Sequence, residues 1–259
     1  MRYSITLSYD GSAYNGWQFQ NNAASIQESL QLALSTLLKD TVSVTGAGRT
    51  DSKVNAIGYV AHFDWDGAAI DTALLGCKLN AMLPGDIIVH GVYPAKDCFH
   101  ARFDATEREY TYFIHRRKDP FMEKYSHRCS YALDTEAMNE AASLLLGTHD
   151  FSCFEKTGSD NKTSVCTVTE AVWKSYVPPH AALMHYPAAE GDYLYFRICA
   201  NRFLRNMVRA VVGSLIDVGR GRRSPEWIAE LIKSGTRSDA GESVPGKALF
   251  LSRIDYPEK

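Results

Sequence analysis

A short segment with two glycines, an arginine and an aspartate has the composition of a catalytic loop. It runs from Gly46 to Asp51 in an otherwise apolar neighbourhood. Glycine lets the backbone approach a ligand closely, and the hydroxyls of Thr45 and Thr50 can hydrogen-bond the nearby backbone. The segment therefore suits a turn that presents the Asp51 carboxylate as a nucleophile. The alternative is an ordinary turn with a solvated pair of Arg49 and Asp51, because glycine-rich turns are common.

The composition is that of a globular protein without signals for a membrane or a metal. Of 259 residues, 45% are hydrophobic and 22% are charged, and no apolar run reaches the roughly 20 residues of a membrane helix. Residues 1–7 alternate like a strand and do not open a signal peptide. The six scattered cysteines form no Cys-x-x-Cys pair and no zinc-ligand spacing with histidine. We therefore expect a cytoplasmic protein with reduced cysteines, no metal and no membrane contact.

Basic residues are concentrated in one segment, although the whole chain is slightly acidic. The formal net charge is −2, so any surface that attracts a polyanion must be local. The segment contains Arg202, Arg205, Arg209, Arg220, Arg222 and Arg223. Guanidinium groups suit phosphate, but a solvated helix face explains such a cluster equally well.

The hydrophobic periodicity predicts two successive halves with a boundary near residue 105. In the first half we expect strands at 2–9 and at about 41–47, 57–64 and 86–93, with helices at 25–38 and at about 70–80. Ser25 and Glu28 form a capping box at the start of the first helix. The first half therefore has the order βαββαβ.

The second half repeats that order with insertions. We expect strands at about 106–116, 165–176, 192–200 and 248–255, and helices at about 134–146, at 203–218 and from 224. The domains are thus 1–105 and 106–259. The predicted fold is α+β, with two pseudo-duplicated split βαβ halves of the ferredoxin or RRM type. Their antiparallel sheets are expected to flank a central active-site cleft.

A series of motifs in this chain resembles the tRNA pseudouridine synthase A family. The motifs lie at Tyr9–Gln20, Ser25–Glu28, Ala47–Asp51, Asn80–Ile87, Phe99–Thr106, Arg108–Tyr112, Gly147–Phe151 and Asn201–Gly213. They cover most of the chain, and their number and order carry the resemblance. In the first motif, Tyr14 and Trp17 suit either stacking on RNA or packing within the domain.

The resemblance implies a reaction on tRNA. Uridines of the anticodon stem-loop, at positions 38, 39 and 40 in the family, would be isomerised to pseudouridine without a cofactor. The bond between C1′ and N1 breaks, and the sugar rejoins the same base at C5. We also expect a homodimer, because two protomers that each supply basic surface would explain how a chain with a net charge of −2 binds tRNA.

The resemblance also implies roles for individual residues. Asp51 would be the catalytic carboxylate, acting either covalently or through a glycal intermediate. Arg49 would position phosphate or assist flipping of the nucleotide, and Tyr110 would stack on the flipped base. Arg209 would pair with Asp51 and keep it ionised. Leu249 would form the apolar floor of the uracil pocket. The pattern alone also allows purely structural roles. Arg49 would then form a salt bridge and Arg209 would lie on a helix surface. Tyr110 and Leu249 would be core residues.

The chain departs from the family pattern directly after Asp51. Family members read Ala-Gly-Val-His there, whereas this chain reads Ser52-Lys53-Val54-Asn55. Lys53 replaces a glycine, so a positive φ at this position would be strained. Lys53 also adds positive charge beside the RNA path, as Arg202 and Arg205 would do. We expect retained activity with altered loop geometry or tRNA preference.

Two other functions are possible alternatives: a silent tRNA-binding protein and a glycoside hydrolase. A catalytically silent tRNA-binding protein would share the fold, but the combination of Asp51 with Arg49, Tyr110 and Arg209 favours catalysis. A glycoside hydrolase would need two nearby acids. Only Asp51 lies in the motif, with Asp64 and Asp66 further along the chain.

Overall fold

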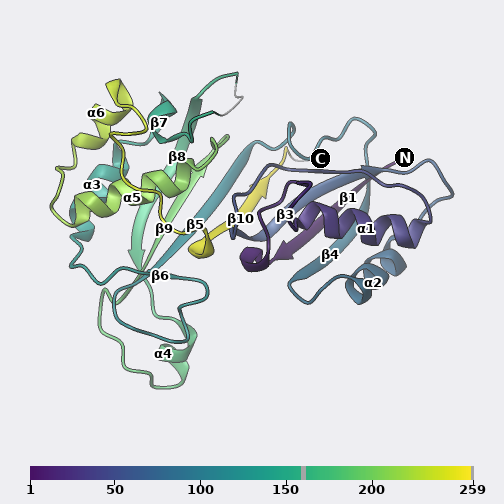
Figure 1. Cartoon of the computed structure of the whole chain (residues 1–259), viewed down its shortest axis with the longest axis horizontal. Coiled ribbons are helices and arrows are strands. Elements are labelled where there is room, and N and C mark those ends of the chain that lie inside the picture. The colour runs from purple at the N-terminus through teal and green to yellow at the C-terminus, as the bar shows by residue number, and fades with distance from the viewer. Residues whose placement is uncertain (159–161, 258–259) are drawn as a thin grey trace. The chain divides into compact units, whose positions relative to one another are not determined.

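The chain folds into two units, each of mixed α+β structure. A computed structural model describes residues 1–158 and 162–257. The first unit is Met1–Glu107 together with the strand from Phe250, and the second is Arg108–Leu249. Within each unit the strand pairs are mostly antiparallel (Figure 1). The sequence places a single boundary near residue 105, whereas the chain also returns to the first unit at Phe250.

The first unit is a sheet with helices on its apolar side. Its elements are β1 (Arg2–Tyr9), α1 (Ile26–Leu38), β2 (Val44–Gly46), β3 (Asn55–Asp64), α2 (Thr72–Met82), β4 (Ile87–Ala95) and β10 (Leu249–Asp255). The strand order is β4-β1-β3-β10, and β2 pairs with the end of β3. Alternate side chains of β1, from Tyr3 to Tyr9, are buried. The helices contact each other and bury apolar residues, so they cover this face.

The predicted order βαββαβ of the first half is confirmed. The Ser25 side chain accepts a hydrogen bond from the backbone N–H of Glu28 at 3.3 Å, as the capping box predicts. Such a cap contributes about 1 kcal/mol to helix stability. The strand β2 is shorter than predicted, because the chain leaves the sheet after Gly46 and returns to it only at Asn55.

The second unit is built around a nearly fully buried helix. Its elements are β5 (Glu107–His115), β6 (His127–Arg128), α3 (Thr135–Ser143), β7 (Gly147–Asp150), β8 (Val165–Ser175), α4 (Pro179–Leu183), β9 (Tyr193–Ala200), α5 (Met207–Gly219) and α6 (Trp227–Ser234). The strand order is β5-β9-β8-β7, with β6 parallel to β5. In α5 only Arg209 and Asp217 are not buried. The helix α3 packs against α5 and β8.

The prediction for the second half differs from the structure at helix ends and short elements. The segments β6, β7 and α4 were not predicted, because they are too short for a periodic pattern. The helix α5 starts at Met207 and not at residue 203. Asn206, at its N-cap, has a φ of 67° and so interrupts any earlier helical turn. The helix α3 ends at Ser143 and not at residue 146, and Gly147, with a φ of 99°, opens β7.

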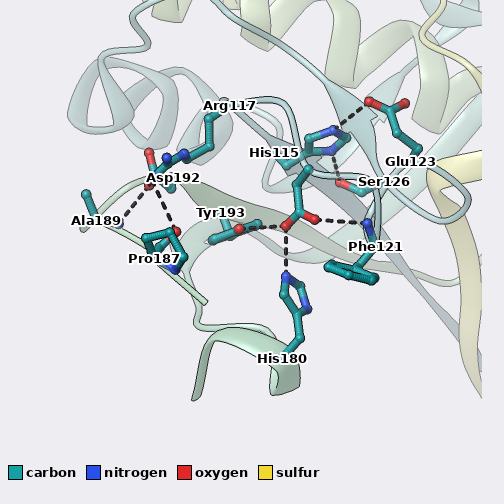
Figure 2. Close-up of polar contacts among 11 residues, drawn as sticks. His115, Arg117, Phe121, Glu123, Ser126, His180, Pro187, Ala189, Asp192 and Tyr193 are labelled. Carbon is teal, nitrogen blue, oxygen red and sulfur yellow. Dashed lines mark hydrogen bonds and ion pairs between the residues drawn. The ribbon is translucent and has the colours of Figure 1, made fainter. Parts of the chain in front are cut away.

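A buried carboxylate holds the loops at one end of the second unit. Asp119 is fully buried and accepts hydrogen bonds from the Tyr193 hydroxyl at 2.7 Å and from the backbone N–H of Phe121 at 2.9 Å (Figure 2). Its third neighbour is Nε2 of His180, at 2.8 Å. Burial acts to raise the pKa of the Asp119 carboxyl, but these hydrogen bonds outweigh it and hold the pKa below its ordinary value. The carboxylate thereby ties the loop after β5 to β9 and α4.

Replacing this carboxylate should destabilise the fold. We expect Asp119→Asn to lower the free energy of unfolding by about 2 kcal/mol at pH 7, because buried partners lose their charged acceptor. The carboxylate's contribution is complete above the ordinary pKa of about 3.9 and is lost as the pH falls through the lower pKa of the folded state. Urea unfolding at pH 7 and at about pH 3 measures both effects, with the exposed Asp66→Asn as control. Equal stability at pH 7 would contradict the role.

Candidate functional site

The predicted catalytic segment forms the loop between β2 and β3. The Tyr59 hydroxyl holds its first part, accepting a hydrogen bond from the Gly48 N–H at 3.3 Å and donating one to the Gly48 carbonyl. Arg49 is exposed and Asp51 is partly exposed, whereas Thr50 between them is only 7% exposed. The loop therefore turns Arg49 and Asp51 outward and Thr50 inward.

Tyr9, Trp17 and Tyr59 form an aromatic floor under this loop. Trp17 stacks on Tyr59 with ring centroids 4.1 Å apart, and the Tyr9 ring lies 5.6 Å from Tyr59 and 6.3 Å from Trp17. All of these rings are buried, and so is Tyr14. Trp17 and Tyr14 therefore have the packing role and not the RNA-stacking role. No sequence pattern distinguishes Tyr9 or Tyr59 as a support of this loop, although Tyr9 opens the first motif.

The turn after Asp51 takes a conformation that glycine adopts most easily. Lys53 has a φ of 65°, and its N–H donates to the Tyr14 carbonyl at 3.1 Å. The N–H of Val54 donates to the Asp51 carbonyl at 3.2 Å. Lys53 thus keeps the turn closed, in the left-handed region that costs a non-glycine residue about 1 kcal/mol. The sequence indicates strain only if φ is positive here, and the structure shows that it is positive.

Restoring a glycine should relieve this strain. We expect Lys53→Gly to raise the free energy of unfolding by up to about 1 kcal/mol, less the entropy that glycine adds to the unfolded chain. Lys96, an exposed lysine whose φ is not positive, is the matched control, and Lys96→Gly should lose stability. Urea unfolding compares the two variants. A similar loss in both would mean that the Lys53 backbone is not strained.

Tyr110 lies on β5 of the second unit and is partly exposed. Its ring meets Phe203 edge-on, with centroids 5.0 Å apart. Tyr112, two residues along the same face, is fully buried and donates a hydrogen bond to the Pro245 carbonyl at 3.1 Å. Tyr112, and not Tyr110, is thus the fully buried core tyrosine of this strand.

Arg209 lies in the first turn of α5, the helix that supports it. Its Nε donates to the Val244 carbonyl at 2.7 Å, and the Val244 N–H donates to the Arg209 carbonyl at 3.2 Å. Burial raises the pKa of the nearby Tyr112, and the positive charge of Arg209 opposes this shift. The segment from Val244 therefore orients the guanidinium.

Leu249 is buried at the start of β10. It directly precedes Phe250, which pairs with Asn55 in parallel register. Two groups of predicted site residues result. Arg49, Asp51 and Lys53 share one loop of the first unit, whereas Tyr110, Arg209 and Leu249 belong to the second unit. Their meeting at one site stays a prediction.

The arginine-rich segment is not one continuous basic face. The helix α5, with 13 residues and a length of about 20 Å, separates Arg202 and Arg205 from the arginines beyond Gly219. Those beyond it are engaged within the second unit, with Arg220 3.4 Å from the Tyr131 ring centroid, Arg223 4.9 Å from that of Trp227, and Arg222 3.2 Å from Asp217. Arg202 and Arg205 therefore remain the candidates for RNA contact.

Other kinds of site have little support in the described part of the chain. No group of three or more His, Cys, Asp or Glu side chains there is placed to hold a metal ion. Two hollows of the second unit, of about 330 and 420 Å³, include none of the predicted site residues. None of the helices described has both the length and the hydropathy to span a bilayer.

Comparison with known proteins identifies the family. A family profile described as tRNA pseudouridine synthase matches residues 141–257. The tRNA pseudouridine synthase A of Bacteroides fragilis is 45% identical over 259 residues, which cover 100% of this chain and 97% of that protein. The Bacteroides thetaiotaomicron protein of that name is 46% identical (99% and 91% covered), and the Bacillus subtilis one is 38% identical (99% and 99%). The chain therefore belongs to the tRNA pseudouridine synthase A family.

Proposed function

We propose that this protein isomerises uridines 38, 39 and 40 of the tRNA anticodon stem-loop, with Asp51 as the catalytic group. Family membership makes it a tRNA pseudouridine synthase, an isomerase. One observation carries the finer proposal: Asp51 is a partly exposed carboxylate beside the exposed Arg49, in a loop held from below by buried hydroxyl groups. A preorganised carboxylate of this kind suits a reaction at a flipped nucleotide.

The chemistry needs one carboxylate and no external reagent. The bond between C1′ and N1 breaks, the uracil turns, and the bond between C1′ and C5 forms. The C5 proton leaves to solvent and N1 takes up a proton, so the product is an isomer of the substrate. In the covalent route the ionised Asp51 forms a bond to the sugar or the base, and this bond breaks again before the product leaves. In the glycal route Asp51 accepts a sugar proton and returns it to the same carbon when the bond between C1′ and C5 forms. Both routes remain within the proposal, since both need the same ionised side chain.

We assign the remaining roles as follows. Arg49, exposed on the same loop, positions phosphate or assists flipping of the target nucleotide. Arg209, held by Val244, is the ion partner of Asp51, and the partly exposed ring of Tyr110 stacks on the target base. Leu249 supplies the apolar floor of the uracil pocket.

The proposal also includes the arrangement of the two halves, the oligomeric state and the location of the protein. We propose that the two halves are pseudo-duplicated, that their sheets flank the active-site cleft, and that the protein works in the cytoplasm as a homodimer. The net charge of −2 supports the dimer, because two protomers double the local basic surface available to one tRNA.

Removal of the carboxylate tests the catalytic assignment. With an anticodon-arm RNA tritiated at uridine C5, Asp51→Asn should release tritium at least about 1,000-fold more slowly than the unsubstituted protein, because the reacting group is lost. Asp66→Asn, an exposed aspartate, should keep full activity. An active Asp51→Asn protein would overturn the assignment. If the unsubstituted protein binds the RNA without releasing tritium, the silent binding protein is the better description, and free uracil would point to a hydrolase.

Charge removal tests the RNA-binding residues. Arg205→Ala should weaken tRNA binding and reduce the slope of log affinity against log salt concentration by about 1, because one phosphate contact is lost. Arg222→Ala is the matched control, since Arg222 lies beyond the other end of α5 and pairs with Asp217. Filter binding over a salt series measures both variants. Equal slopes in the two variants would remove Arg205 from the RNA interface.

A further inference from the structure

We propose that Thr50 is a positioning residue for Asp51, and that its buried hydroxyl sets the direction in which the catalytic loop presents the carboxylate. Thr50 itself does not touch the reacting atoms in this proposal. The inference rests on the proposed catalytic role of Asp51 and concerns how that side chain is held.

The Thr50 hydroxyl is held from two directions by segments distant in the sequence. Its Oγ1 accepts a hydrogen bond from the backbone N–H of Trp17 at 3.1 Å and shares a second with the Tyr9 hydroxyl at 3.0 Å. One hydroxyl can make both bonds, because it has one donor and two acceptor positions. Tyr9 lies at the end of β1 and Trp17 lies in the loop between β1 and α1, so the contacts anchor Thr50 to the sheet and to this loop.

The backbone of Thr50 is clamped as well. Gly16, with a φ of 89°, lies so close that a Cβ at this position would be 2.1 Å from the Thr50 carbonyl oxygen. The loop thus has no room to move toward Gly16, and the two hydrogen bonds oppose movement away from Tyr9 and Trp17. A β-branched side chain adds to this rigidity, because its χ1 angle is restricted.

Because Thr50 is held in place, the orientation of Asp51, the next residue in the chain, is restricted too. Exposure alternates along the segment, with Arg49 exposed, Thr50 buried and Asp51 partly exposed. Because Thr50 faces inward, its neighbours on both sides face outward. A loop free to rotate about Thr50 would place the carboxylate variably, and displacements of about 1 Å at a reacting group can cost about 100-fold in rate.

The experiment separates the hydroxyl from the bulk of the side chain. Thr50→Val keeps the shape and removes the hydroxyl, so kcat for tritium release should fall by about 10- to 100-fold with little change in KM for the RNA. Thr50→Ser keeps the hydroxyl and should retain most of kcat. Tyr9→Phe removes the second hydroxyl of the pair and should lower kcat by about 3- to 10-fold.

A matched control accounts for lost stability. Ser126 is a buried serine of the second unit whose hydroxyl contacts Nδ1 of His115 at 3.0 Å. Ser126→Ala should lose stability without a change in kcat. All variants are assayed well below their unfolding temperatures, so a fall in kcat for Thr50→Val that Ser126→Ala does not share reports positioning.

The outcomes distinguish this inference from the proposed function. An active Asp51→Asn protein overturns the function. An inactive Asp51→Asn with a full kcat in folded Thr50→Val leaves the function standing and overturns the positioning role, as does a Thr50→Ser protein that is impaired as much as Thr50→Val. If Thr50→Val does not fold, Tyr9→Phe decides, because an unchanged kcat there contradicts the hydroxyl pair and a lowered kcat at constant KM supports it.

Discussion

The stack of Trp17 on Tyr59 is the contact on which the β2–β3 loop depends. The two ring centroids are 4.1 Å apart and both rings are buried, so they form a rigid surface that supports the loop. The Tyr59 hydroxyl bonds Gly48, and the Trp17 backbone N–H bonds Thr50. A Cβ at Gly46 would lie 2.2 Å from the Tyr59 hydroxyl and 2.5 Å from the Trp17 ring. The first glycine of the segment is therefore required by this stack.

Other motifs of the family also serve the scaffold of the first unit. Burial, with the nearby charges of Arg2 and His100, lowers the pKa of His62 to about 4. The neutral ring is consistent with its role, since its Nδ1 accepts the N–H of Ala101 at 3.1 Å. Arg2 donates to the Phe99 carbonyl at 2.7 Å. The motif at 99–106 is thus held against β1 and β3 by polar contacts.

In the second unit a backbone carbonyl orients one basic side chain, Arg209. Val244 directs Arg209, and the left-handed Asn206 starts α5 at the point where Arg209 falls in its first turn. The same helix then separates the two groups of arginines. An arginine-rich sequence segment therefore forms two separate groups of arginines, of which the second contacts Tyr131, Trp227 and Asp217.

The sequence by itself determined the family, the α+β class, the order of the first six elements and the place of the Asp51 segment. These follow from local signals, such as the Ser25 cap, the alternation of β1 and the ordered motifs. Only the tertiary structure decided that Tyr14 and Trp17 are buried, that Lys53 adopts a positive φ, and that Thr50 is clamped. The physical reason is distance along the chain: Thr50 lies 41 residues from Tyr9 and 33 from Trp17. No local pattern records such a contact, because it exists only once the sheet and the loops around it have formed.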